Sequence, residues 1–370
     1  MPRVSMVVRH LLNREGSGVT DHVLLTWINE FSILLEELGH SLEVWQEGTR
    51  WNKVYYGVGK IFAIPEKDPH ACSLPNVNQA MWESSADISL AVYQDPLLVY
   101  PQPHQVSITL GQSIPSPDML ADRSTPQTRR EWKNQLMQGI SSVNHVVTNN
   151  TQFIQWVISS WPGLSHKLKH IPDFLEPEPS HDVAPKNMPP SGDTIRIVFP
   201  CPALPRFGTS ETLRAVNALL DQYSQVEFYF CGNLPPSIET HMQKWVDQRP
   251  RCYLNSGEKI NYNFADIALF PIKREPVPVK SVIEAMEAGA VVIGSMWGPL
   301  VDFIISGYNG LLIKPTDTDI FLAVQRLIEN PVLKENLGVK AQETRKSFKK
   351  DIWKSRWQSL INELLRGEVQ

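Results

Sequence analysis

A lysine, a serine and a glutamate stand at the start of an apolar helix pattern in the second half of the chain. Lys280 and Ser281 come at its beginning, Glu284 lies in its first turn, and Gly289 ends it. The N–H groups of a helix start bind anions, above all where the helix follows a strand of an α/β sheet. Lys280 adds a cation, and Glu284 can accept hydrogen bonds from sugar hydroxyls. The segment 275–289 therefore predicts a site for an anion such as a nucleotide diphosphate.

The same residues also have a purely structural interpretation. Ser281-Val-Ile-Glu284 fits a capping box, in which Ser281 caps the helix and Glu284 bonds back to the N–H of Ser281. Lys280 is then an ordinary surface lysine. The residue types alone do not decide between the two interpretations.

Two other loops carry residues suited to phosphate. Arg206, in Pro205-Arg-Phe-Gly208, can clamp diphosphate oxygens with its guanidinium, and a solvated loop arginine is the alternative. Gly16-Ser-Gly18 opens the first long helix pattern, but a lone Gly-x-Gly equally describes a flexible loop. The chain has neither a P-loop nor a complete GxGxxG.

Other chemistries find little support in the sequence. His104 and His145 border predicted strands, and we interpret both as ordinary surface or core residues. No Ser/His/Asp or HExxH arrangement is visible, and Asp317-Thr-Asp319 is better explained as a helix start than as a metal site. The widely spaced cysteines indicate buried or incidental thiols in a reducing compartment; they are Cys72, Cys201, Cys231 and Cys252.

The overall composition is that of a globular protein with two domains. The chain has 370 residues, too many for one ordinary core. A net charge of −4 argues against a nucleic-acid-binding surface over the whole protein. The apolar run at the start is too short for a signal peptide, and no stretch approaches a membrane span. We expect a cytoplasmic protein, with peripheral membrane contact and homo- or hetero-oligomerisation left open.

Strand and helix patterns alternate through both halves of the chain. The first half predicts strands at 4–8, 41–45, 88–92, 105–110 and 145–148, and helices at 21–38, 124–139 and 151–158, the last capped near Asn150. The second half predicts strands at 196–199, 227–231, 252–254, 267–270, 291–293 and 311–313, and helices at 209–223, 236–249, 319–329 and 350–365.

This alternation predicts an α/β fold with parallel sheets. We place one doubly wound domain at 1–175, a Pro-rich linker at 176–192, a second doubly wound domain at 193–349 and a final helix at 350–366. Two such domains facing each other leave a cleft at the carboxyl ends of their strands, where ligands of these folds bind.

The chain resembles family 4 of the glycosyltransferases, which have the GT-B fold. The resemblance is strongest in Phe-Ala-Asp-Ile-Ala-Leu-Phe-Pro (264–271), Glu-Ala-Met-Glu-Ala-Gly-Ala-Val-Val-Ile (284–293), Gly-Pro-Leu-Val-Asp (298–302) and Gly-Tyr-Asn-Gly-Leu-Leu-Ile (307–313). Leu-Gly-His-Ser-Leu-Glu-Val-Trp (38–45) and Ile-Pro-Asp-Phe (171–174) extend it into the first half. In this family the final helix crosses back onto the first domain.

The resemblance implies a retaining transferase that takes a sugar from a nucleotide-diphosphate donor, with no cofactor and generally no metal. Glu284 would bind the donor ribose, and Glu275 would contact the donor sugar. Arg206 and Lys280 would neutralise the diphosphate. The remaining donor-site residues implied in this way are Ser281, Val282, Gly208 and the loop with Gly16 and Gly18.

Three departures set the chain apart from the family pattern. Glu275 lies nine positions before Glu284 instead of eight, so Pro276 takes the register of the family's first glutamate. Phe207 stands where lysine is typical, and Leu110 lies in a segment where the family often has a histidine. A non-catalytic GT-B module that acts as a binding or partner subunit is therefore the alternative function. A cofactor-dependent oxidoreductase is disfavoured by the lack of a dinucleotide fingerprint.

Overall fold

The computed structural model divides the chain into two compact units, which are described one at a time. The first unit comprises Met1–Ile171 and Trp353–Gln370, and the second comprises Pro172–Ile352. The structure describes residues 2–8, 11, 22–48, 52–56, 59–65, 86–92, 106–110, 126–174, 194–201, 203–232, 234, 236–256, 260, 262–273, 279–296 and 298–366. The predicted linker at 176–192 lies outside these residues.

The first unit is built on a sheet that is parallel except at one edge. Its strands are β1 (Arg3–Val7), β2 (Ser41–Gly48), β3 (Asn52–Tyr56), β4 (Gly59–Pro65), β5 (Ile88–Val92), β6 (Val106–Leu110), β7 (His145–Thr148) and β8 (Leu168–His170). They lie in the order β3-β4-β2-β1-β5-β6-β7-β8, and β3 with β4 is the antiparallel pair. The order reverses between β1 and β5, as expected for a doubly wound sheet.

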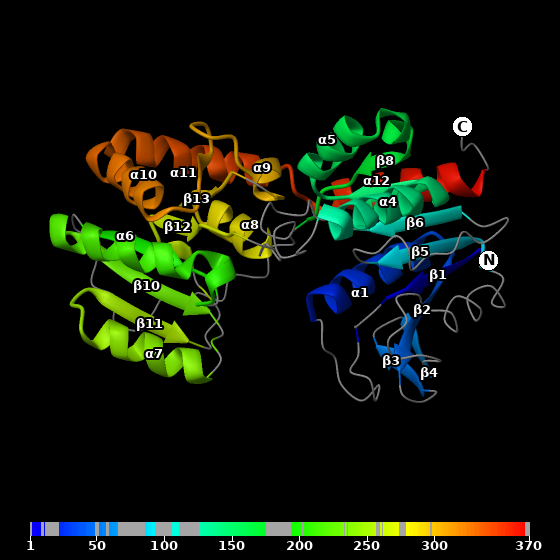
Figure 1. Cartoon of the computed structure of the whole chain (residues 1–370), viewed down its shortest axis with the longest axis horizontal. Coiled ribbons are helices and arrows are strands. Elements are labelled where there is room, and N and C mark those ends of the chain that lie inside the picture. Colours follow the sequence, from blue (N-terminus) through cyan, green and yellow to red (C-terminus); the bar gives the residue numbers. More distant parts are fainter. Residues whose placement is uncertain are drawn as a thin grey trace. The chain divides into compact units, whose positions relative to one another are not determined.

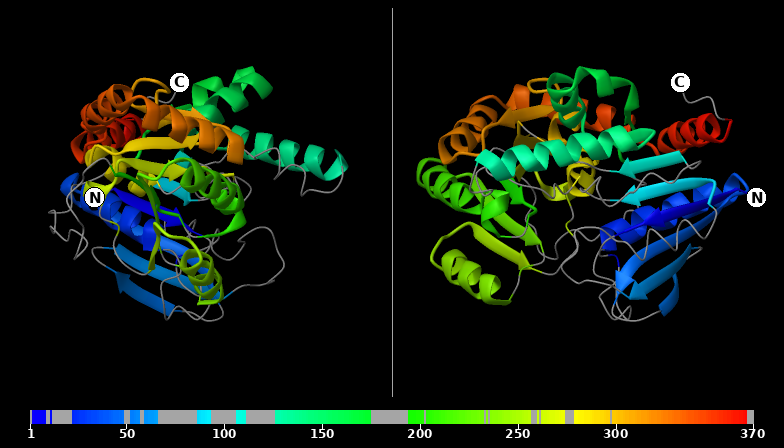
Figure 2. Two further views of the ribbon diagram at one scale, coloured as in Figure 1. Left: turned by 90° about the vertical axis from the view of Figure 1, so that its left-hand side faces the viewer. Right: turned by 45° about the vertical axis from the view of Figure 1, so that its right-hand side comes forward.

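Helices of the first unit are α1 (His22–Glu37), α4 (Pro126–Ser142, teal in Figure 2), α5 (Thr151–Ser160) and most of α12 (Lys350–Leu365, red in Figure 1), with the short 3-10 helix η2 (Pro162–Lys167). Asn150 caps α5 as predicted, because its side-chain oxygen accepts hydrogen bonds from Gln152 N and Phe153 N at 3.0 and 3.2 Å.

An aromatic cluster holds α12 against α1. Trp353 and Trp357 are fully buried, and the Trp357 ring lies 4.9 Å from the Phe31 ring and 5.9 Å from the Trp27 ring, centroid to centroid. Such edge-on aromatic pairs add to the free energy of burial. The last helix of the chain is therefore part of the core of the first unit.

The second unit contains a fully parallel sheet. Its strands are β9 (Ile195–Phe199), β10 (Val226–Gly232), β11 (Cys252–Ser256), β12 (Ile267–Phe270), β13 (Val291–Ser295) and β14 (Gly310–Ile313), in the order β11-β10-β9-β12-β13-β14. Every residue of β9, β12 and β13 is buried, which is the burial expected of central strands covered on both faces.

Helices pack around this sheet (Figure 1). They are α6 (Thr209–Gln222), α7 (Pro236–Asp247), α8 (Val279–Glu287), α9 (Leu300–Phe303), α10 (Asp317–Glu329) and α11 (Pro331–Arg345), with the 3-10 helices η3 (Pro205–Phe207) and η4 (Tyr262–Phe264). Helix α6 packs beside α10, and α8 packs beside α11. Among the described helices, none combines the length and the apolar character needed to cross a lipid bilayer.

The hydrophobic pattern predicts most of these elements but misses several. Strands β3, β4 and β8 and helices α9 and α11 are additions to the predicted order. Helix α11 is missed because its buried face includes the small residues Gly338 and Ala341, so its sequence shows no broad apolar stripe. Gly338 lies so close to the Gly289 carbonyl that a side chain would overlap it.

Truncation of Trp357 to alanine should destabilise the first unit strongly. We expect a loss of about 3–5 kcal/mol in the free energy of unfolding, because a fully buried ring is removed from the α1–α12 cluster. Urea unfolding followed by fluorescence measures the loss. Gln358→Ala, at an exposed position of the same helix, should stay within about 0.5 kcal/mol of the wild type. Equal effects of the two substitutions would contradict the packing described.

Candidate functional site

The candidate site of the second unit forms where its strand order reverses. Strands β9 and β12 are neighbours, and the chain leaves them in opposite directions across the sheet, toward β10 and β13. Ligands of open parallel sheets bind at the carboxyl ends of the strands beside such a reversal. The loop after β9 carries Arg206 and Gly208, and the segment after β12 leads into α8.

The structure joins these two segments directly. The Lys273 N–H donates to the carbonyl of Arg206 at 2.8 Å. Gly208 has a φ of 73°, and a Cβ at this position would overlap the backbone oxygen of Pro271. Only glycine therefore allows both the left-handed turn and the close approach of the two segments. The predicted Gly208 is therefore fixed by packing against the segment that follows β12.

Packing also explains why a phenylalanine follows Arg206. Phe207 is buried in the core of the second unit, whereas Arg206 is exposed. The Arg206 guanidinium carbon lies 5.0 Å from the centre of the Phe207 ring, and within the described residues this guanidinium forms no ion pair. A lysine at 207 would have to leave the core to reach a ligand. Arg206 remains the cation that this loop offers.

Helix α8 begins earlier than its sequence predicts. Its first residue is Val279, so Ser281 is the third residue of the helix and the capping-box interpretation of Ser281 is wrong. Val282 is completely buried, so its side chain belongs to the core and only its backbone could contact a donor. Helix α8 can start at Val279 because Val279 and Lys280 both adopt helical geometry and no helix-breaking residue stands between Pro278 and Ser281.

Lys280 and Glu284 lie on the same face of α8. Their closest charged atoms, Lys280 Nζ and Glu284 Oε1, are 3.8 Å apart. Lys280 is exposed and Glu284 is half-buried. A surface pair of this spacing stabilises a helix by only about 0.2–0.5 kcal/mol.

Sequence reasoning missed Lys273, which the structure places at the same junction. Its ammonium lies 2.8 Å from Glu211 Oε1, in the first turn of α6. Burial alone would raise the pKa of Glu211, but the hydrogen bond from Lys273, with the charges of Lys273 and Arg214, outweighs it and lowers that pKa. The sequence signal that could have found Lys273 is its position, three residues after a buried strand at the point where the strand order reverses.

Several predicted residues lie outside the described part of the chain. These are Glu275 with its neighbour Pro276, the glycines Gly16 and Gly18, His104 and Cys72. Leu110 ends β6, and its side chain also falls outside the description. Their proposed roles stay predictions.

The residues for which the sequence predicts no catalytic or metal-binding role have structural positions. Cys201, Cys231 and Cys252 are buried and form no disulfide, as predicted. Asp317-Thr-Asp319 starts α10, capped by Thr316, which confirms its interpretation as a helix start. His145 is buried, as a core histidine should be, with Nε2 3.7 Å from Glu363 Oε1. Within the described residues no group of three or more His, Cys, Asp and Glu gathers as a metal ion would require.

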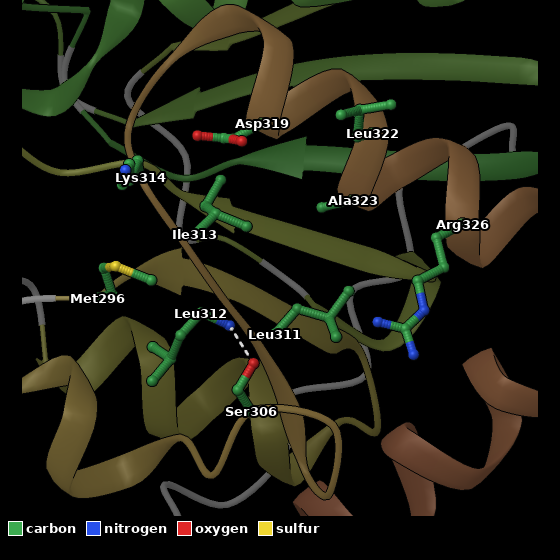
Figure 3. A pocket seen from close by; sticks show the side chains of 10 residues that line it. All are labelled: Met296, Ser306, Leu311, Leu312, Ile313, Lys314, Asp319, Leu322, Ala323 and Arg326. Atoms are coloured by element: carbon green, nitrogen blue, oxygen red, sulfur yellow. Dashed lines mark hydrogen bonds between the residues drawn. The ribbon is translucent and has the colours of Figure 1, made fainter.

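A pocket of about 370 Å³ opens elsewhere on the second unit, between β14 and α10 (Figure 3). Apolar side chains of β14 and α10 line it, with Lys314, Asp319 and Arg326 at its margin. No residue of α8 or of the Arg206 loop contributes to it. The pocket is therefore separate from the predicted donor site.

The second unit matches a family of known function. Residues 197–344 match the family model described as Glycosyl transferases group 1, which confirms the resemblance predicted from the motifs of this half. The stretch includes Arg206, Lys280 and Glu284. No curated protein matches the chain.

Solved structures with the same fold cover nearly the whole chain. Sucrose-phosphate synthase from Thermosynechococcus elongatus is 15% identical, with a TM-score of 0.68 over 99% of this chain and 100% of its own. A glycosyltransferase from Rickettsia africae ESF-5 is 14% identical, with a TM-score of 0.69 over 98% of each chain. Anabaena Alr3699/HepE in complex with UDP is 12% identical, with a TM-score of 0.70 over 98% and 100%. The fold is therefore GT-B, as predicted.

Gly208→Ala should cost far more stability than an alanine at another left-handed glycine. We expect a loss of about 3 kcal/mol or more, because backbone strain adds to the overlap with Pro271. Gly307→Ala is the matched control, since Gly307 has a φ of 83° but nothing within 4 Å of its missing Cβ. That control should lose only about 1–2 kcal/mol. Urea unfolding of both variants measures the difference, and similar losses would rule out the overlap.

Glu211→Gln should make the second unit less stable at neutral pH but not in acid. The lowered pKa of Glu211 stabilises the folded state above the ordinary glutamate value of 4.5, and this stabilisation disappears as the pH falls through the folded pKa. We expect a deficit of about 1 kcal/mol at pH 7, since both groups are partly exposed. Thermal unfolding from pH 7 to pH 3 tests this, and a deficit that persists at pH 3 would contradict it.

Proposed function

We propose that the protein is a GT-B hexosyltransferase that moves a sugar from a nucleotide-diphosphate donor to an acceptor with retention of anomeric configuration. The observation that carries the proposal is the junction of the segments after β9 and β12. There, the Lys273 N–H donates to the Arg206 carbonyl just before helix α6 begins, within the residues that match the family. Candidate acceptors are a cell-surface glycan, a protein or a secondary metabolite.

The donor diphosphate is the group that suits this junction best. Helix α6 follows Gly208 without a side-chain cap, so the N–H groups of Thr209 and Ser210 can face an anion, whereas the Glu211 N–H bonds to its own carboxylate. Arg206 and Lys273 lie at the same junction, and Lys280 lies in the first turn of α8. The leaving diphosphate gains charge as the glycosidic bond breaks, and cations and amides directed at its oxygens lower the barrier.

Uridine nucleotides are the donors to test first, because Anabaena Alr3699/HepE is solved with UDP and with UDP-glucose. Glu284 would accept hydrogen bonds from the ribose hydroxyls, and Glu275 would contact the donor sugar. The loop with Gly16 and Gly18 would border the acceptor. We propose transfer without a resident cofactor or a required metal.

Glu284→Ala should weaken nucleotide binding without unfolding the protein. Hydrogen bonds to a carboxylate are worth about 1.5–3 kcal/mol, so we expect the Kd for UDP to rise about ten- to a hundredfold. Isothermal titration calorimetry measures the Kd, and thermal unfolding checks the fold.

Glu335→Gln removes an exposed carboxylate of α11 and serves as the control, with an unchanged Kd. Failure of the wild type to bind any of UDP, GDP or their sugars would refute donor binding. Binding without hydrolysis or transfer of any donor sugar would favour the non-catalytic module instead.

A further inference from the structure

The loop that carries Arg206 offers a diphosphate one cation where the family pattern has two. Phe207 takes the position of the second, and its side chain is buried in the core of the second unit. A diphosphate carries several negative charges, which a single exposed arginine leaves partly uncompensated. A compensating cation has to come from another segment of the chain.

Lys273 lies beside the position that lacks the lysine. Its backbone N–H donates to the Arg206 carbonyl at 2.8 Å, so the main chain at 273 is next to that of 206 and 207. The close approach of Pro271 to Gly208 holds the same two segments together. Lys273 is therefore anchored to the Arg206 loop, although it follows β12 and is distant along the sequence.

Glu211 directs the ammonium of Lys273 toward the start of α6. Lys273 Nζ lies 2.8 Å from Glu211 Oε1, and Glu211 stands in the first turn of α6. This helix follows Gly208 without a side-chain cap. The ammonium is thus held at a helix start, where a bound anion would meet both backbone N–H groups and a cation.

Lys273 is the outer member of this ion pair. Its side chain is 34% exposed, whereas that of Glu211 is 15% exposed. Glu211 Oε2 is buried and accepts no hydrogen bond from the residues that the structure describes. A ligand that arrives from solvent therefore meets the ammonium before it meets the carboxylate.

Arg214 allows Glu211 to release Lys273. An Arg214 guanidinium nitrogen, Nη2, lies 3.3 Å from Glu211 Oε1, and Arg214 Nε lies 2.6 Å from Asp317 Oδ2. Removing the last partner of a partly buried carboxylate is costly. Because Arg214 stays in place, Glu211 keeps a cation when the Lys273 ammonium turns to a ligand, and that cost is reduced.

We propose that Lys273 is the phosphate-binding lysine of this chain. When the donor binds, the Lys273 ammonium leaves Glu211 for the oxygens of the diphosphate, and Glu211 remains paired with Arg214. The inference rests on the proposed function and deepens it, because it assigns to Lys273 the cation that the family pattern has at position 207.

Lys273→Met tests the contact with phosphate. We expect the Kd for UDP to rise about ten- to a hundredfold, the scale of one charge-assisted hydrogen bond, and the Kd for uridine to stay unchanged because uridine has no phosphate. Lys273→Arg should bind UDP more tightly than Lys273→Met because it keeps the charge. Calorimetry measures the Kd for UDP, and ligand-observed NMR measures that for uridine. An unchanged Kd for UDP, or an equal loss for uridine, would overturn the proposal.

The double variant Lys273→Met with Glu211→Gln separates a ligand contact from a structural ion pair. It removes one positive and one negative charge, so the net charge of the junction is unchanged and the fold carries no carboxylate that has lost its lysine. We expect the same loss of UDP affinity as in Lys273→Met. Binding like that of the wild type would mean that Lys273 only pairs with Glu211, and would overturn the proposal. This variant also takes the place of Lys273→Met if that one does not fold.

A second ion pair of the same unit provides the matched control. Lys340 Nζ lies 2.7 Å from Glu343 Oε2 on α11. The double variant Lys340→Met with Glu343→Gln should leave the Kd for UDP unchanged. A loss as large as that of the Lys273 variants would show that removal of any such pair weakens binding, and would overturn the specific role of Lys273.

The outcomes also distinguish this inference from the proposed function. A wild type that binds no nucleotide in the panel overturns both. A wild type that binds UDP while Lys273→Met binds it equally well overturns the role of Lys273 alone. A loss of UDP affinity in Lys280→Met without one in Lys273→Met does the same, and assigns the second cation to α8.

Discussion

The contact between Gly208 and Pro271 is the constraint on which the candidate site depends. Because Gly208 has no side chain and adopts a positive φ, the segments after β9 and β12 can touch. That approach lets Lys273 bond to the Arg206 carbonyl and reach Glu211 with its ammonium. The charged groups of the site are thus placed by backbone packing, and their mutual attraction only refines the arrangement.

Sequence periodicity predicts the central strands well because their physics is local. Strands β5, β7 and β12 are apolar runs bounded by polar or turn residues, and their predicted limits agree with the structure. Helix α11 escapes prediction because its contact is made by small residues such as Gly338, whose value depends on Gly289 far along the chain. Strands β3 and β4 form an antiparallel pair at a sheet edge, and neither Asn-Lys-Val-Tyr-Tyr nor Gly-Lys-Ile-Phe-Ala-Ile-Pro alternates apolar with polar residues.

The candidate site also contains residues that a local sequence pattern indicates and residues that only the tertiary structure brings together. Glu284 and Lys280 are charged residues at a predicted helix start, so their types and spacing are enough to propose them as site residues. The position of Lys273 and the burial of Phe207 depend on which strands become neighbours, and no local sequence pattern predicts that. The start of α8 at Val279 shows the same limit, because the sequence offers Ser281 as an equally good cap.

The division of the first unit between two distant chain segments has a consequence for synthesis on the ribosome. The second unit is continuous, from Pro172 to Ile352, whereas the first unit needs Trp353 and Trp357 to fill its core. Domains generally fold as they emerge, starting from the amino terminus. Here the later unit can be complete first, while the earlier sheet waits, with Phe31 uncovered, for the last helix to be made. The order of folding would then run opposite to the order of translation.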